Sequence, residues 1–160
     1  MRIYKLLILL FFTGQSSFAF NVDSTEKKII VTDKLNHFSL EVPSDALIEP
    51  GTSAEGDNML MINVFAEHFP FGILITESDS IPKSFLHITS STSYQSKSYI
   101  FENHEIKGYQ NKSSFFFFKK TGDVYYFFLV ATNKPIDDNK NEFTHVLKII
   151  NSFKVISKGF

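Results

Sequence analysis

Two short segments of the chain match motifs of serine acyl-transfer enzymes. Residues 80–83 (Ser-Ile-Pro-Lys) fit the pattern Ser-x-x-Lys, and residues 120–122 (Lys-Thr-Gly) follow in the order found in penicillin-binding proteins and serine β-lactamases. Those enzymes also need a Ser-x-Asn element between the two motifs and a much longer chain to build the cleft. A helix-capping serine and a hairpin turn explain both segments. We therefore predict no catalytic residues and no enzyme activity.

The histidines and carboxylates offer one weak metal-binding pattern. Glu102 and His104 are two residues apart on a predicted strand, so their side chains share a face. With a third ligand from elsewhere they could bind a transition metal or calcium. The alternative is a solvated polar face. The sequence predicts no metal site and no cofactor, with this pair as the only candidates, because no two histidines have metal-ligand spacing: His37, His68, His87, His104 and His145.

Aromatic side chains next to flexible backbone are candidates for recognition. The connection at residues 68–71 (His-Phe-Pro-Phe) carries Phe69 and Phe71 beside a proline. The polar segment 49–58 is a second exposed loop of this kind. The alternative is that both rings cap one end of the core. Phe69 and Phe71 are the candidate partner-binding residues.

The first nineteen residues have the pattern of an export signal. Arg2 and Lys5 are followed by an unbroken apolar run at 6–12 and by small residues at 17–19 (Ser-Phe-Ala). We predict cleavage after Ala19, leaving residues 20–160 as one soluble domain in the periplasm or outside the cell. The chain has no cysteine, so disulfides and a lipoprotein attachment site are absent.

The charge of the predicted mature chain argues against nucleic-acid and membrane-surface partners. Without residues 1–19 it has no arginine, and its fourteen lysines face seventeen acidic residues, a formal charge of −3. The lysines are scattered rather than gathered in a stripe. Phosphate and base recognition use arginine and clustered positive charge.

The most informative structural pattern is a pair of uninterrupted apolar runs around a turn. Residues 115–118 and 124–130 flank the turn 119–123 and are apolar at successive positions. Because strand side chains alternate between faces, such a hairpin must be covered on both sides. We predict a three-layer α-β-α sandwich on a mainly antiparallel sheet, an α+β fold, with Phe116 and Phe117 buried on opposite faces.

The remaining elements follow from periodicity and turn residues. A terminal helix begins near Asp137 and Asp138, and its apolar residues Phe143, Val146, Leu147 and Ile150 are expected to cover one face of the hairpin. A two-turn helix from Ile81, capped by Ser80, is expected on the other face. The predicted strands are 27–33, 37–42, 59–66, 71–77, 99–109 with a kink at Gly108, and 152–156.

The order of these elements resembles the PsbP-like superfamily. The resemblance rests on residues 38–43 (Phe-Ser-Leu-Glu-Val-Pro), a central hairpin, residues 106–108 (Ile-Lys-Gly), the Tyr/Phe-rich strand and a terminal helix that leads into 152–154. It implies an α-β-α sandwich and no catalytic motif. Members serve as photosystem extrinsic subunits, as partners of other proteins and as exported bacterial proteins.

These observations together favour an exported, soluble, non-catalytic binding module that engages another protein or an envelope component. One alternative is a small-ligand or metal-binding carrier, which would have a closed cavity lined by rings. The other is a small hydrolase with an unrecognised site.

Overall fold

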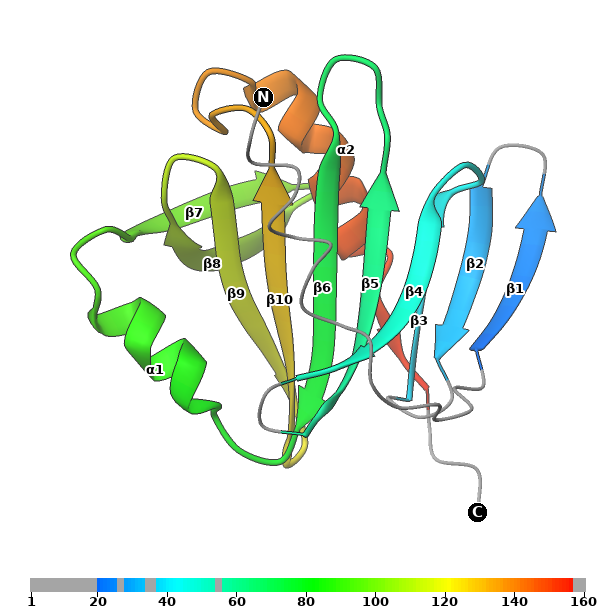
Figure 1. Ribbon diagram of the computed structural model, residues 1–160, viewed down its shortest axis with the longest axis horizontal. Coiled ribbons are helices and arrows are strands. Elements are labelled where there is room, and N and C mark those ends of the chain that lie inside the picture. The colour runs from blue at the N-terminus through cyan, green and yellow to red at the C-terminus, as the bar shows by residue number, and fades with distance from the viewer. Residues whose placement is uncertain (1–19, 26–27, 34–36, 54–55, 157–160) are drawn as a thin grey trace.

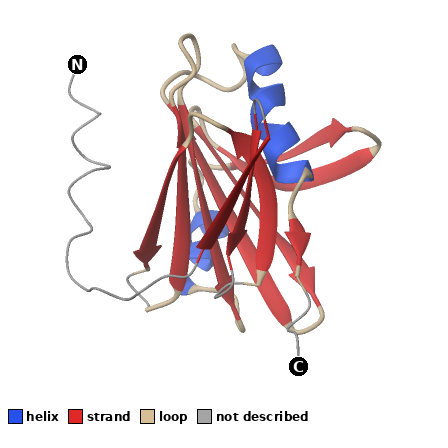
Figure 2. Ribbon diagram, turned by 90° about the vertical axis from the view of Figure 1, so that its right-hand side faces the viewer, coloured by secondary structure: helices blue, strands red, loops and turns tan. Residues whose placement is uncertain are grey.

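Strands dominate the computed structural model, which describes residues 20–25, 28–33, 37–53 and 56–156 (Figures 1 and 2). Two antiparallel sheets run through it. The smaller has the order β1 (Phe20–Thr25), β2 (Lys28–Asp33), β3 (Phe38–Pro43), β11 (Lys154–Val155). The larger has the order β4 (Leu47–Thr52), β5 (Asn58–Val64), β6 (Phe71–Ser78), β10 (Val124–Thr132), β9 (Ser114–Thr121), β8 (His104–Gln110), β7 (Gln95–Phe101). The helices are α1 (Lys83–Ser90) and α2 (Lys140–Asn151).

The aromatic hairpin β9–β10 lies inside the larger sheet and is covered on both faces. Phe117 belongs to the main core, where its ring stacks on that of Phe128 with centroids 4.5 Å apart. Phe116 belongs to a smaller cluster on the other face, 4.6 Å from the ring of Phe85 on α1. Phe116 is 8% exposed and Phe117 is 6% exposed. The prediction that these neighbours are buried on opposite faces is confirmed.

The main core fills the space between the larger sheet, the smaller sheet and α2. Phe143 of α2 packs on Phe115, with ring centroids 6.0 Å apart. At the end of α2, Phe153 contacts rings from both sheets, Phe38 at 5.2 Å and Phe128 at 5.0 Å. The expected apolar face of the terminal helix is confirmed, and this core joins the two sheets.

The predicted three-layer α-β-α sandwich is wrong. The described residues are mostly in strands, with only two helices among them, and a second antiparallel sheet lies beside α2 over the inner face of the larger sheet. On the outer face, α1 packs against only the hairpin and its neighbour β8. A strand that is apolar on both faces must be covered on both, but its sequence does not say whether helices or strands cover it.

The predicted strand 99–109 is also wrong, because the chain reverses in its middle. Glu102 and Asn103 take positive φ angles of 47° and 66° and form a two-residue turn between β7 and β8. Two positive φ angles are typical of the turns that join tight hairpins. Gly108 lies in β8, next to the first residue that pairs with β9. An added Cβ there would lie 2.4 Å from the carbonyl oxygen of Phe116.

Other expectations had mixed outcomes. The first hairpin is confirmed as β2–β3, and the central pair as β5–β6. The segment 49–58 is not wholly a loop, since β4 reaches Thr52 and pairs with β5. A helix follows Ile81, but Pro82 rather than Ser80 is its N-cap.

Two further points concern the predicted signal peptide and the character of the helices. The predicted signal peptide, residues 1–19, lies outside the described residues. Within the described part of the chain, neither helix has the length and apolar character needed to cross a membrane.

Candidate functional site

A pocket of about 520 Å³ lies where the β3–β4 turn, the β5–β6 loop and α2 meet. We call it the groove, because it is partly open to solvent along one side. The turn is closed by a hydrogen bond from the Ala46 amide to the Pro43 carbonyl, 3.1 Å. The β5–β6 loop is held at its far end by a hydrogen bond from the Asn133 amide to the Pro70 carbonyl, 3.3 Å. Secondary structure on three sides therefore positions the groove.

The floor of the groove is apolar and continuous with the main core. Phe69 is 2% exposed and Phe71 is 6% exposed, and their ring centroids are 6.4 Å apart. Three aliphatic side chains complete the floor: Val42, Val64 and Ile149. All five belong to the main core cluster, so the floor is rigidly supported.

Ionisable side chains form the rim. Four carboxylates line it against a single lysine, and two histidines lie between them. The acidic residues are Glu41, Asp45, Glu67 and Glu142, and the others are His68, His145 and Lys148. On α2 the residues Glu142, His145 and Ile149 recur at three- and four-residue spacing, which places them along one side of the helix. The groove thus combines an apolar floor with a predominantly negative rim.

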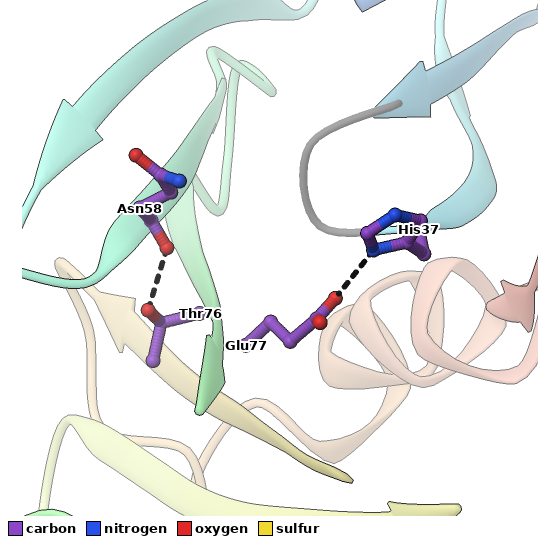
Figure 3. Close-up of polar contacts among 4 residues, drawn as sticks. All are labelled: His37, Asn58, Thr76 and Glu77. Atoms are coloured by element: carbon purple, nitrogen blue, oxygen red, sulfur yellow. Dashed lines mark hydrogen bonds and ion pairs between the residues drawn. The ribbon is translucent and has the colours of Figure 1, made fainter. Parts of the chain in front are cut away.

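A separate polar cluster joins the two sheets at the opposite end of β6 (Figure 3). Nδ1 of His37, next to β3, lies 3.4 Å from Oε2 of Glu77 on β6. Within the larger sheet, the Thr76 hydroxyl of β6 donates a hydrogen bond of 2.7 Å to the Asn58 carbonyl of β5. Burial, together with the Glu77 charge, raises the pKa of Tyr126 to about 12. These contacts connect β6 to its neighbours in both sheets, so we assign them a structural role.

A second polar network closes the joint between β7, β8 and the segment before α2. Nζ of Lys97 lies 3.0 Å from Oδ1 of Asp137, and this hydrogen bond lowers the pKa of that carboxyl. The Tyr99 hydroxyl donates a hydrogen bond to the side-chain oxygen of buried Gln110. Burial and the Asp137 charge raise the pKa of Tyr99 to about 12. A pocket of about 350 Å³ lies here, and its lining includes the hydrogen-bonded side chains of Lys97, Gln110 and Asp137.

The candidate metal ligands predicted from sequence do not form a cluster. Glu102 lies in the β7–β8 turn and accepts a hydrogen bond of 3.0 Å from the Asn151 side chain of α2, while His104 begins β8 and is exposed. Across the described residues, no group of three or more histidines or carboxylates could hold a metal ion. Ser80 follows the end of β6, and α1 begins at Lys83. Ser78 and Lys120 both pair with Tyr125, so the two motif segments lie at the same end of the larger sheet with β10 between them.

Of the sequence candidates, only Phe69 and Phe71 lie at the groove, and both also cap the core, as the alternative reading predicted. The helical half of the site was not among the sequence candidates: Glu142, His145 and Lys148. The spacing of Glu142, His145 and Ile149 indicated that they share one side of a helix. That this side faces the loop at 65–71 across the groove is visible only in the structure.

The search for related proteins returned no protein family, no curated protein and no solved structure that matches this chain.

Proposed function

We propose that the chain is an exported, non-catalytic binding module that engages another polypeptide or an envelope component through the groove. The observation that carries this proposal is the groove itself: a rigid apolar floor of Phe69, Phe71 and Ile149, open to solvent and bordered by charged side chains. Binding sites typically combine an apolar surface with a few polar groups that fix orientation.

The lining of the groove supports binding rather than catalysis. The described lining residues include no hydroxyl or thiol side chain that could act as a nucleophile. Among the described residues, the groups with raised or lowered pKa values do not line the groove: Tyr99, Glu105, Tyr126 and Asp137. Catalytic groups are usually found where perturbed pKa values and a cleft coincide.

The shape of the groove favours a polypeptide segment over an enclosed small ligand. A carrier would be expected to have a closed, ring-lined cavity between the aromatic hairpin and a helix. That space is occupied by side chains, with the rings of Tyr99 and Phe143 5.0 Å apart. The groove lies at the edge of the core instead, where a chain can approach from solvent.

Site-directed photo-crosslinking tests this proposal. A photoreactive amino acid replaces Ala66, an exposed rim residue whose substitution leaves every rim charge in place, and in a control replaces Lys107, which is 73% exposed on β8. Both variants are irradiated in cells that produce the protein. We expect discrete covalent adducts from position 66 and not from position 107. Identical adducts from both positions, or none from position 66, would overturn the proposal.

A further inference from the structure

The excess negative charge of the chain is concentrated around the groove. Residues 20–160 carry fourteen lysines and seventeen acidic residues, a formal charge of −3. The groove lining carries four carboxylates and one lysine, which is also −3 with both histidines neutral. The rest of residues 20–160 therefore carries equal numbers of lysines and acidic residues. The local field at the groove, rather than the net charge of the molecule, selects a charged partner.

Several of these carboxylates have no cation of their own. Within the described residues, Asp45 and Glu142 make no side-chain hydrogen bond or ion pair. Glu67 has only His68, at 4.0 Å, and both of these side chains are more than four-fifths exposed. Rim charges left without cations are available to a ligand that supplies them.

We propose that the groove binds an apolar side chain that is flanked by lysine or arginine in an exposed segment of a partner polypeptide. This inference rests on the proposed function and specifies the chemistry of its ligand. The apolar side chain would displace water from Phe69, Phe71 and Ile149, and the flanking cations would lie against the rim. A volume of about 520 Å³ has room for such side chains, since small-ligand sites span roughly 300–1,000 Å³.

The two parts of the site have different roles in this binding. Exposed ion pairs contribute little affinity each, but they raise association rates and reject partners of the wrong sign. Burial of the apolar side chain supplies most of the affinity. The interaction should therefore require both features and should weaken with salt, because screening shortens the reach of the rim charges.

A panel of three labelled peptides tests the inference by fluorescence anisotropy with the mature chain. The first carries Leu-Phe between lysines, the second carries Leu-Phe between glutamates, and the third carries Ser-Ser between lysines. We expect the first to bind at least about tenfold more tightly than either of the others. Its affinity should fall several-fold when the salt concentration rises from about 0.01 M to about 0.15 M.

Two charge-reversal variants test whether the charge preference of peptide binding comes from the rim of the groove. Glu142→Lys should weaken the first peptide by about three- to fivefold and strengthen the second, since it removes one rim anion and adds a cation. Asp123→Lys makes the same change of charge in the β9–β10 turn, at the opposite end of the larger sheet, and should change neither affinity (Figure 1). Circular dichroism and a thermal melt show that both variants are folded.

The outcomes separate this inference from the proposed function. Equal or tighter binding of the glutamate peptide, or equal effects of Glu142→Lys and Asp123→Lys, would overturn the ligand chemistry. Groove-specific crosslinking from position 66 could still hold in that case. Loss of that crosslinking would remove the proposed function, and the ligand chemistry with it.

Discussion

Gly108 is predicted to be intolerant of even a methyl group. A Cβ added at this position would lie 2.4 Å from the Phe116 carbonyl oxygen and 2.8 Å from two carbons of the Phe115 ring. The oxygen belongs to the paired strand β9, so it cannot rotate away as a flexible side chain would. Overpacking of a core typically costs about 1–3 kcal/mol, and a clash with backbone belongs at the upper end. We expect Gly108→Ala to lower the free energy of unfolding by about 3 kcal/mol.

Thermal and urea unfolding measure this effect. For a chain of this size, about 3 kcal/mol corresponds to a fall in Tm of roughly 6–12 °C. Gly51→Ala in β4 is the matched control, because the nearest atom to its added Cβ is the Met59 methyl at 3.6 Å, an ordinary contact. The control should stay within about 1 kcal/mol of the wild type. If both variants melt alike, the close approach of β8 to β9 is not as described.

Three further predictions test the packing and the polar networks. Phe85→Ala should lose about 3–5 kcal/mol of stability in urea unfolding, because the buried Phe85 ring packs α1 on the hairpin. Leu86 is 53% exposed on the same helix, so the control Leu86→Ala should lose no more than about 0.5 kcal/mol. Equal losses would contradict the packing of α1. Tyr99 and Tyr126 should ionise near pH 12, as measured by tyrosinate absorbance. Because an unfolded tyrosine has a pKa near 10.0, the free energy of unfolding contributed by these two groups should be constant up to about pH 10 and fall as the pH rises towards 12. Titration of every tyrosine near pH 10 in the folded protein would refute their burial. His37 already bears the strain of a φ of 52°. His37→Ala keeps that strain and loses the contact with Glu77, so it should cost about 0.5–1 kcal/mol in urea unfolding. His37→Gly loses the same contact but relieves the strain, so it should be more stable than His37→Ala by up to about 1 kcal/mol, and the reverse order would contradict the left-handed backbone.

The sequence was informative wherever local periodicity decides the structure. The uninterrupted apolar run around Phe116 and Phe117 required burial on both faces, and the spacing from Phe143 to Ile150 required a helix with one apolar side. These are properties of a few consecutive residues, so they can be read without knowing the rest of the fold.

The sequence was uninformative wherever distant segments compete for the same position. The inner face of the hairpin could be covered by helices or by a second sheet, and nothing near Phe117 distinguishes them. The Glu102–Asn103 turn lacks the glycine that usually marks a tight hairpin, so the sequence predicts a continuous strand there. Gly108 suggested a kink, although its role is to admit the backbone of the adjacent strand.

The candidate site shows the same division. Phe69 and Phe71 could be selected because aromatic residues in a proline-containing connection are unusual for a solvated loop. Glu142 and Asp45 could not, because their relation to the aromatic floor depends on α2 packing beside the β3–β4 turn. A groove built from three separate segments becomes visible only in the folded chain.

Amide hydrogen exchange of residues 20–160, with and without the lysine-flanked Leu-Phe peptide, tests the central claim most directly. If the groove is the binding site, the peptide should slow exchange in the β5–β6 loop at residues 65–70 and around the exposed side of α2, while β7, β8 and α1 stay unchanged. Slowed exchange on α1 or the outer face of the hairpin, with none in the β5–β6 loop, would contradict the assignment of the groove as the binding surface.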